Sequence, residues 1–301
     1  MPRICIVRRS TEVLAVILTA SFFIASPSFA GAPGRVETVL APAWLERNGK
    51  EGPLTPGTEI RNGDIVKTGS GSRAYLMLAE GSRVKLGEAA RFEFHDSSLE
   101  PQGLFRGVFN VAAGAFRFTT GLLLKSRERE VTIQIATATI GIRGTDVWGR
   151  ATPDSELVAL IEGKIELSRA GQSFLMEPMS LMDARRGEAG QLKRFDFATL
   201  QLLAAETEIS SGRALRENGT WMLVHDGLTG QVQAIGLYDR LRAAGYPAQI
   251  RPVRTNIAGV GEWLYSVFID RFATGEDATQ TAIVLQKASG ALFKPRKRGK
   301  S

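Results

Sequence analysis

Short runs of alternating apolar and polar residues, separated by glycine turns, fill the chain from Val36 to about Arg186. In one such run, Ala74, Leu76 and Leu78 would share one face of an extended strand. Turn sequences such as Glu162-Gly163-Lys164 separate the runs, and no long helical period appears between them. The pattern predicts an all-β domain over residues 36–194, with stacked, solenoid-like coils rather than an open flat sheet. The clearest runs are 72–79, 82–87, 90–96, 131–142, 156–169 and 173–184.

The pattern changes after residue 194. Leu200, Leu203, Ala204 and Thr207 follow the i, i+3, i+4, i+7 spacing of an amphipathic helix. Residues 210–220 are rich in small and polar side chains and are typical of a linker. We therefore expect a connecting helix and linker over 195–217, followed by a second domain.

The last part of the chain alternates predicted strands and helices. Two segments are predicted helices: 231–245, which ends at Gly245, and a second one that follows the capping box of Thr274 and Asp277 and ends at Gly290. The order is βαββαβ, so we expect an α+β, split-βαβ (ferredoxin-like) domain over 218–295. In such a domain two helices cover one face of an antiparallel sheet and the other face is free. The predicted strands are 221–226, 246–253, 263–272 and 291–293.

Both ends of the chain carry basic residues. Arg3, Arg8 and Arg9 precede a short apolar run over 13–25 and small residues up to Ala30, which is typical of a secretory signal peptide over 1–30, cleaved after Ala30. The run is too short for a membrane span, although an uncleaved anchor is the alternative. The only cysteine, Cys5, lies in this segment. We expect a periplasmic protein without disulfides or an integral span, and a solvated basic tail over 296–301.

The stretch ATATIGIRGTDVWG, residues 136–149, contains two close glycines, an arginine and an aspartate. A phosphate-binding loop needs glycines between a strand and the N-terminus of a helix, whereas a strand-like segment comes next here. We interpret the stretch as a buried strand that turns a corner at Gly141 and Gly144, with Arg143 and Asp146 pairing or capping the backbone. A partner-binding loop is the alternative. The turn TGSGSR, residues 68–73, is interpreted in the same way.

No arrangement of residues points to catalysis. No pair of carboxylates stands out as a glycosidase pair, and His95 and His225 lie far apart without a metal-ligand motif. We therefore predict a protein that is not an enzyme and needs no metal or cofactor. The net charge of +7 and an open sheet are compatible with RNA binding, but the export signal argues against a nucleic-acid partner.

Alternation in the strand 263–272 selects the residues of a binding face. Tyr265, Val267 and Ile269 would pack under the helices, which leaves Ser266 and Phe268 on the free face. By the same alternation the neighbouring strand adds Gln249 and Arg251. An exposed aromatic ring among hydrogen-bonding side chains suits an amino-sugar chain. The alternative is that Phe268 packs against the last strand or the tail.

Two family resemblances accompany these patterns. Residues 57–94, GTEIRNGDIVKTGSGSRAYLMLAEGSRVKLGEAARFEF, and the stretch TATIGIRGTDVWG resemble the FecR domain over about 36–187. This resemblance implies a periplasmic β-rich, solenoid-like module. FecR domains occur in regulators of iron-uptake signalling, which carry an anti-sigma segment and a membrane span before the domain, and also beside cell-wall-binding modules. Neither of those preceding segments is seen here, so the signalling role is not expected.

The second resemblance covers the end of the chain. LYDRLRAAGYPAQIRPV (237–253) and EWLYSVFIDRFATGEDATQTAIVLQ (262–286) are similar to the SPOR domain, over about 219–295. This resemblance implies binding to peptidoglycan glycan strands stripped of their peptides, at division sites, through Gln249, Arg251, Ser266 and Phe268. We therefore expect a cell-wall-associated binding protein. The alternative is an envelope sensor or scaffold, in which the FecR-type domain binds another protein and the SPOR domain serves only for localisation.

Overall fold

The computed structural model describes residues 33–100, 104–121, 129–142, 144–188, 190–210, 212–257 and 260–299, without the side chains of 255–257 and 260–262. The predicted signal peptide lies outside the described residues. Residues 31–301 cluster as one compact unit. Among the residues described, none of the helices is both long and apolar enough to cross a membrane.

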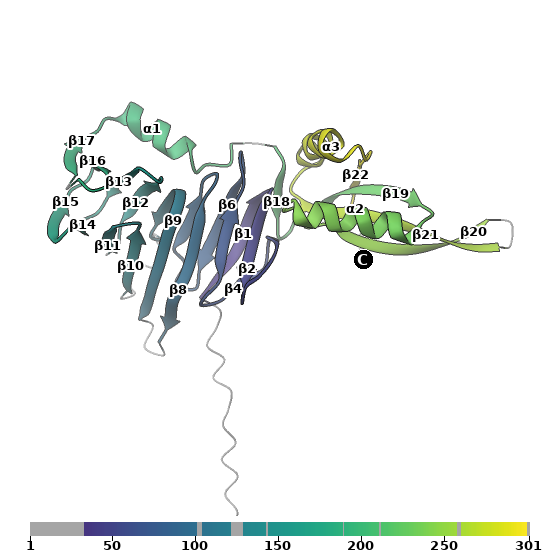
Figure 1. The fold of residues 1–301 in the computed structure, drawn as a ribbon, viewed down its shortest axis with the longest axis horizontal. Coiled ribbons are helices and arrows are strands. Elements are labelled where there is room, and N and C mark those ends of the chain that lie inside the picture. The colour runs from purple at the N-terminus through teal and green to yellow at the C-terminus, as the bar shows by residue number, and fades with distance from the viewer. Residues whose placement is uncertain are drawn as a thin grey trace, which may run out of the picture. The chain divides into compact units, whose positions relative to one another are not determined.

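Two β layers face each other in the first part of the chain, which confirms the predicted all-β region (Figure 1). Alternate residues of both layers are buried between them: Phe92 and Phe109 come from one layer, Phe116 and Phe118 from the other. The chain winds from layer to layer, as the predicted coils would. Neighbouring strands are nevertheless antiparallel, apart from the described pair β9–β10, because most reversals are hairpins.

The first layer has the order β17–β16–β13–β12–β9–β7–β6–β1, and the short β4 also pairs with β1. Its strands are β1 (Gly34–Leu40), β4 (Glu59–Ile60), β6 (Arg73–Leu78), β7 (Arg83–Leu86), β9 (Phe105–Thr119), β12 (Asp146–Ala151), β13 (Ser155–Glu162), β16 (Ser180–Arg185) and β17 (Gln191–Arg194).

The second layer has the order β3–β2–β5–β8–β9–β10–β11–β14–β15. Its further strands are β2 (Ala43–Arg47), β3 (Lys50–Pro53), β5 (Ile65–Thr68), β8 (Arg91–Leu99), β10 (Arg129–Ile135), β11 (Ala138–Ile142), β14 (Ile165–Arg169) and β15 (Gln172–Met176). The predicted single run 131–142 is therefore divided by a reversal at Ala136 and Thr137.

Strand β9 belongs to both layers and bends between them at Gly114. Its residues up to Ala113 pair with β8, and those from Gly114 pair with β12. Gly114 has a φ of +79°, and a Cβ at this position would lie 2.4 Å from Cα of Ala90. A residue with a side chain would be strained at this φ and would clash with Ala90. Only glycine fits here, and it allows one strand to join two layers.

The predicted connecting helix is α1 (Phe197–Ala205), which begins at the N-cap Asp196. It lies on the outer face of the first layer, where Leu203 packs beside Trp148, Ala115 and Ala159. Beyond it, Tyr75 holds the next segment on the layer: its hydroxyl donates to Glu208 (2.9 Å) and accepts from the amide of Ile209 (2.6 Å).

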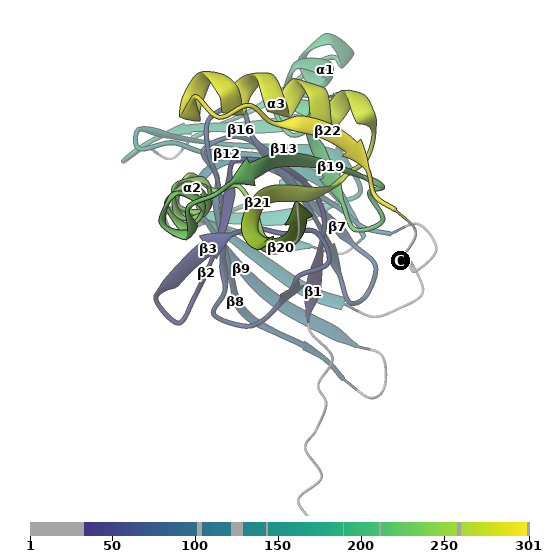
Figure 2. The same cartoon turned by 90° about the vertical axis from the view of Figure 1, so that its right-hand side faces the viewer.

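The C-terminal part contains β19 (Trp221–Leu228), α2 (Gln231–Ala243), β20 (Gln249–Ile257), β21 (Val260–Phe272), α3 (Gly275–Ser289) and β22 (Lys294–Lys297). This is the predicted element order. The strands form an antiparallel sheet in the order β22–β19–β21–β20 (Figure 2). Buried residues of both helices, such as Leu237 and Leu285, belong to one core with Leu223, Val267 and Ile269, so the helices cover one face.

Two sequence predictions were wrong at the ends of this part. The predicted last strand, 291–293, is not a strand; Lys294–Lys297 pairs with β19 instead, although residues from 296 on were expected to be a free tail. The predicted linker contains a further strand, β18 (Ala214–Arg216), which pairs with β1. Leu215 is only 1% exposed, because it lies between Val39 of β1 and Phe272 of β21.

The β layers and the C-terminal part are joined by further specific contacts. Nε1 of Trp44 donates to the carbonyl of Ala243 (3.2 Å), and the amide of Ala43 donates to the carbonyl of Gly245 (3.2 Å). Arg35 forms an ion pair with Glu217. A stretch whose composition is typical of a flexible linker is therefore part of a packed junction.

Candidate functional site

The four residues predicted to form a binding face lie on neighbouring strands of the C-terminal sheet. Gln249 on β20 is directly opposite Phe268 on β21, and Arg251 is opposite Ser266. Directly opposed residues of an antiparallel pair point to the same face. Phe268 and its other neighbour, Val224 of β19, lie outside the core formed with the helices, so this is the face away from α2 and α3.

The expected exposure of Phe268 was wrong. The side chain is only 6% exposed, and the guanidinium of Arg251 lies over its ring with 5.0 Å between the guanidinium carbon and the ring centroid. Arg251 is long enough to reach the ring diagonally, and a cation over an aromatic face is favourable. A sugar therefore cannot stack on that ring face while Arg251 occupies it.

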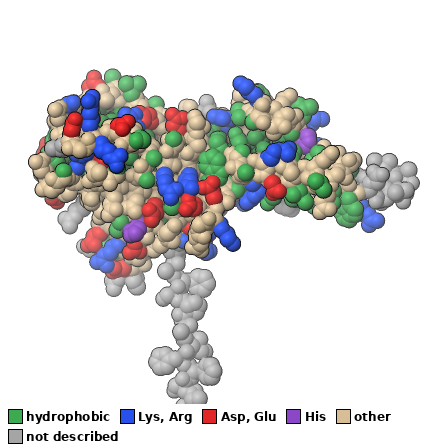
Figure 3. Space-filling view, in the orientation of Figure 1, with side chains coloured by type: hydrophobic (Ala, Val, Ile, Leu, Met, Phe, Trp, Pro, Cys, Tyr) green, Lys and Arg blue, Asp and Glu red, His purple; other side chains and the backbone are tan. Residues whose placement is uncertain are grey.

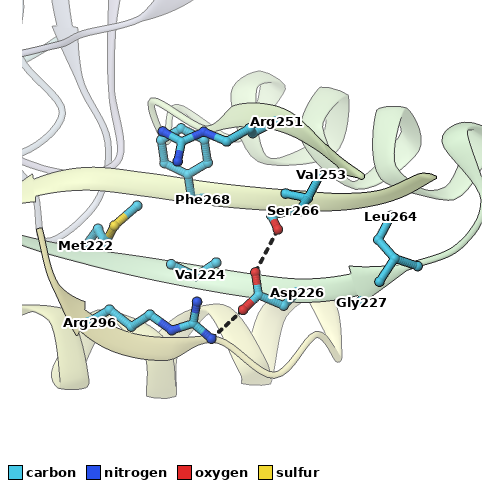
Figure 4. Close-up of a pocket in the computed structure, with 10 residues that line it drawn as sticks. All are labelled: Met222, Val224, Asp226, Gly227, Arg251, Val253, Leu264, Ser266, Phe268 and Arg296. Carbon is cyan, nitrogen blue, oxygen red and sulfur yellow. Dashed lines mark hydrogen bonds and ion pairs between the residues drawn. The ribbon is translucent and has the colours of Figure 1, made fainter. Parts of the chain in front are cut away.

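A pocket of about 330 Å³ opens on this face, and Figure 4 shows its lining residues. It contains three of the four predicted residues, Arg251, Ser266 and Phe268. The fourth, Gln249, is bonded to Asp270 (3.1 Å) and does not line the pocket. The remaining lining residues, which the sequence reasoning did not select, are Met222, Val224, Asp226, Gly227, Val253, Leu264 and Arg296.

Asp226 organises the polar side of this pocket. It accepts a hydrogen bond from Ser266 (2.7 Å) and forms an ion pair with Arg296 of β22. Arg296 could not be selected from the sequence, because its segment reads as a charged tail. One residue in the sequence pointed to such a contact: Asp226, at the end of the predicted strand 221–226. Its carboxylate would need a cationic partner if another strand lay beside it.

A second hollow, of about 530 Å³, lies at one end of the first β layer. We call it the layer-end groove. Small residues from the bend of β9 and the end of β12 line it, together with charged residues from β6, from β12, from the turn before β8 and from the end of α1. Its lining consists of Arg73, Glu88, Ala89, Ala113, Gly114, Ala115, Arg150, Ala151, Thr152, Pro153 and Glu206.

The charged side chains of the layer-end groove are held in different ways. Arg150 forms an ion pair with Glu206 at the end of α1 (2.7 Å), and Glu88 accepts from the amide of Gly71 (2.7 Å). Arg73 donates to the carbonyl of Ser72 (2.8 Å), and its buried Nε has no hydrogen-bond partner in the described structure. The groove is therefore lined by a guanidinium whose Nε is shielded from solvent, beside a floor of small residues.

The stretch 136–149 is a corner of the fold, as its sequence predicts. It contains β11 of the second layer and the start of β12 in the first, so the chain crosses between layers there. Arg143 lies outside the described residues. Asp146 binds Arg117 through two hydrogen bonds (2.9 and 2.7 Å) and accepts one from Thr119 (3.2 Å), contacts that were not predicted. Its predicted pairing with Arg143 stays a prediction.

The titratable groups of the described residues form no metal-binding cluster of three or more side chains. Nδ1 of His95 lies 3.4 Å from a carboxylate oxygen of Glu93, whereas His225 is bonded to the carbonyl of Leu292 (2.7 Å). Burial raises the pKa of Glu80, at the turn between β6 and β7, above its ordinary value. On the face shown in Figure 3, acidic and basic side chains are interspersed over the β layers.

Comparisons with known proteins bear on the first part of the chain. Residues 64–166 match the FecR protein family. The FecR-type region, as we call these matched residues, includes every lining residue of the layer-end groove apart from Glu206. The match confirms the predicted FecR resemblance for this region, and the SPOR resemblance of residues 218–295 stays a prediction.

Among solved structures, two crystal structures of a proposed anti-sigma factor from Parabacteroides distasonis ATCC 8503 are similar to this chain. The sequence identities are 11% and 9%, and the TM-scores are 0.39 and 0.41. Each alignment covers 78% of this chain and 99% of the other. No curated protein matches the sequence.

Proposed function

We propose that this protein is a sensor or scaffold of the bacterial cell envelope, and that its FecR-type region binds another protein. The observation that supports this proposal is the family match over residues 64–166. In this proposal the chain acts in the periplasm by binding, not as an enzyme, and the C-terminal sheet determines where in the envelope it is held.

The layer-end groove is the surface of the FecR-type region that we assign to the partner. Its floor of small residues admits an extended peptide segment, and the positive charge of Arg73 in its lining would attract an acidic group of such a segment. Thr152 is exposed at its edge, so a reactive group at that position would reach a bound partner.

The test is site-specific photo-crosslinking of the full chain in the bacterium that produces it. A photoreactive residue at Thr152 should give one discrete protein adduct, and the additional change Arg73→Glu should remove it. The control position is Ser173, exposed on β15 of the other layer and outside the groove. No adduct from Thr152, or the same adducts from Ser173, would contradict the proposal.

A second candidate function is favoured by the pocket on the C-terminal sheet: binding of peptidoglycan glycan strands. The pocket has accessible apolar side chains, Met222, Val253 and Leu264, against which a sugar ring can lie, and a polar edge of Asp226 and Ser266 for its hydroxyl and acetamido groups. With the SPOR resemblance, this arrangement suggests strands stripped of their peptides, which accumulate at the septum.

Retention of the full chain on isolated cell walls tests this second function. We expect more protein on amidase-treated walls than on untreated walls. Val253→Glu, at the pocket wall, should abolish retention, whereas Val232→Glu, on the exposed side of α2, should not. Equal retention on both kinds of wall, or none, would argue against it. Because the crosslinking experiment uses another surface, the two proposals can fail separately.

A further inference from the structure

The position of Arg251 gives the pocket on the C-terminal sheet a charge preference. The guanidinium is exposed and lies over the Phe268 ring, at 5.0 Å from its centroid. Stacking on a ring uses the flat face of the guanidinium and leaves the N–H groups at its edge free. The group is thereby held over the Phe268 ring, at the pocket that both residues line (Figure 4).

The charges that line this pocket do not cancel. Arg296 is neutralised by Asp226, whose carboxylate also accepts from Ser266. Arg251 forms no ion pair within the described part of the chain. Since two arginines and one aspartate are the charged lining residues, the pocket has one positive charge in excess.

The rest of the lining limits the kind of anion. Met222, Val224, Val253, Leu264 and Phe268 are apolar, and the volume of about 330 Å³ is at the lower end of the range for small-molecule sites. A small inorganic anion would leave this apolar floor without contacts. The lining fits a ligand with an apolar body, one or two hydroxyl or acetamido groups, and a single carboxylate.

We propose that Arg251 binds the free lactyl carboxylate of a muramic acid residue, and that this contact distinguishes stripped glycan from glycan that carries peptides. The inference depends on the proposed glycan-binding function of the same pocket. In a peptide-bearing strand the lactyl group is an amide, so it is neutral and cannot accept a bidentate, charge-assisted pair of hydrogen bonds from a guanidinium. The pocket would therefore recognise the negative charge of the free lactyl group as well as the absence of a bulky peptide.

The experiment is calorimetric titration of the full chain with three matched disaccharides. The first is N-acetylglucosaminyl-N-acetylmuramic acid with a free lactyl carboxylate, the second is its lactyl methylamide, and the third is N,N′-diacetylchitobiose, which lacks the lactyl group. We expect the acid to bind about tenfold more tightly than the amide at neutral pH, as is typical when a charged hydrogen bond is lost.

Variants then assign the difference to Arg251. Arg251→Gln should bring the acid and the amide to within about twofold of each other, and Arg251→Lys should keep part of the preference through its charge. The matched control is Arg254→Gln, an exposed arginine of the same strand that does not line the pocket. Thermal melting of each variant verifies that it is folded.

Each outcome decides a different question. Equal binding of acid and amide, or a preference that survives Arg251→Gln, would overturn the role of Arg251 while leaving glycan binding in place. Absence of binding to all three sugars would overturn both this inference and the glycan-binding function, without bearing on the partner of the FecR-type region.

Discussion

Tyr75 shows how one side chain of the first β layer holds a distant segment. Its hydroxyl bonds both Glu208 and the amide of Ile209, more than 130 residues away in sequence, and Lys85 forms an ion pair with the same glutamate. Burial raises the pKa of Tyr75 to about 12. The sequence identified this residue only as a position on an alternating strand.

Tyr75 should make the stability of the protein fall between pH 10 and 12. A tyrosine in the unfolded chain loses its proton near pH 10, whereas the folded protein retains it to about pH 12, so rising pH favours the unfolded state over this interval. Tyr75→Phe should remove this part of the pH dependence. At pH 8 it should cost about 1–2 kcal/mol, because the amide of Ile209 loses its acceptor.

Urea unfolding at pH 8 and at intervals from pH 10 to 11.5 measures both effects. Tyr238→Phe is the matched control, since the ring of Tyr238 lies under Arg242 and its hydroxyl takes no part in the contacts around Glu208. An unchanged pH profile in Tyr75→Phe would show that burial does not perturb this group.

At the scale of an element, α3 is the helix that the sequence predicted most completely. Its N-cap Thr274, its capping box with Asp277 and its left-handed end at Gly290 are all present. The structure adds a contact that spacing could not predict: Asp277 also accepts from the amide of Ala214 at the start of β18 (3.0 Å). The N-terminus of the helix therefore holds the junction strand as well.

Replacing the two capping residues should separate these roles. Thr274→Ala should lower the free energy of unfolding by about 1 kcal/mol, the usual effect of losing a cap. Asp277→Ala should cost about 2–3 kcal/mol, because it also leaves the buried amide of Ala214 without an acceptor. Glu276→Gln, next to the box in the same turn, is the control. Equal effects of both alanine changes in chemical denaturation would show that the contact with β18 contributes nothing.

At the scale of the molecule, the junction determines whether the β layers and the C-terminal sheet behave as one body. β18 joins β1 to β21, and Trp44 reaches the end of α2. Gly245 is required there, since it has a φ of +79° and a Cβ would lie 2.7 Å from the Trp44 ring. A binding event on the C-terminal sheet would therefore orient the FecR-type region instead of merely tethering it.

We expect residues 33–301 to unfold in one cooperative thermal transition, because such contacts couple the two parts. Trp44→Ala should lower its midpoint by several degrees, through loss of the packed ring and of its hydrogen bond to Ala243. The control is Trp263→Ala, at a tryptophan that is 55% exposed. Calorimetry that resolves two separate transitions in the unaltered protein would contradict this coupling.

The sequence by itself determined the local structure. Alternation and glycine turns predicted the β layers, helical spacing predicted α1, and capping residues predicted α3, because each of these patterns depends on neighbours along the chain. The same alternation placed Arg251, Ser266 and Phe268 on one face. The glycine-rich corner around Asp146 was also predictable, since the strand-like residues after Gly144 exclude the helix that a phosphate-binding loop requires.

Only the tertiary structure decided what these elements meet. It paired Lys294–Lys297 with β19 and brought Arg296 to Asp226; it also made a strand of Ala214–Arg216 and placed Arg251 over Phe268. Charged and small residues have weak local preferences, so their conformation depends on partners that are distant in sequence. For the same physical reason, the alternation of residues assigned Phe268 to one face of the sheet but did not predict whether another side chain would cover its ring.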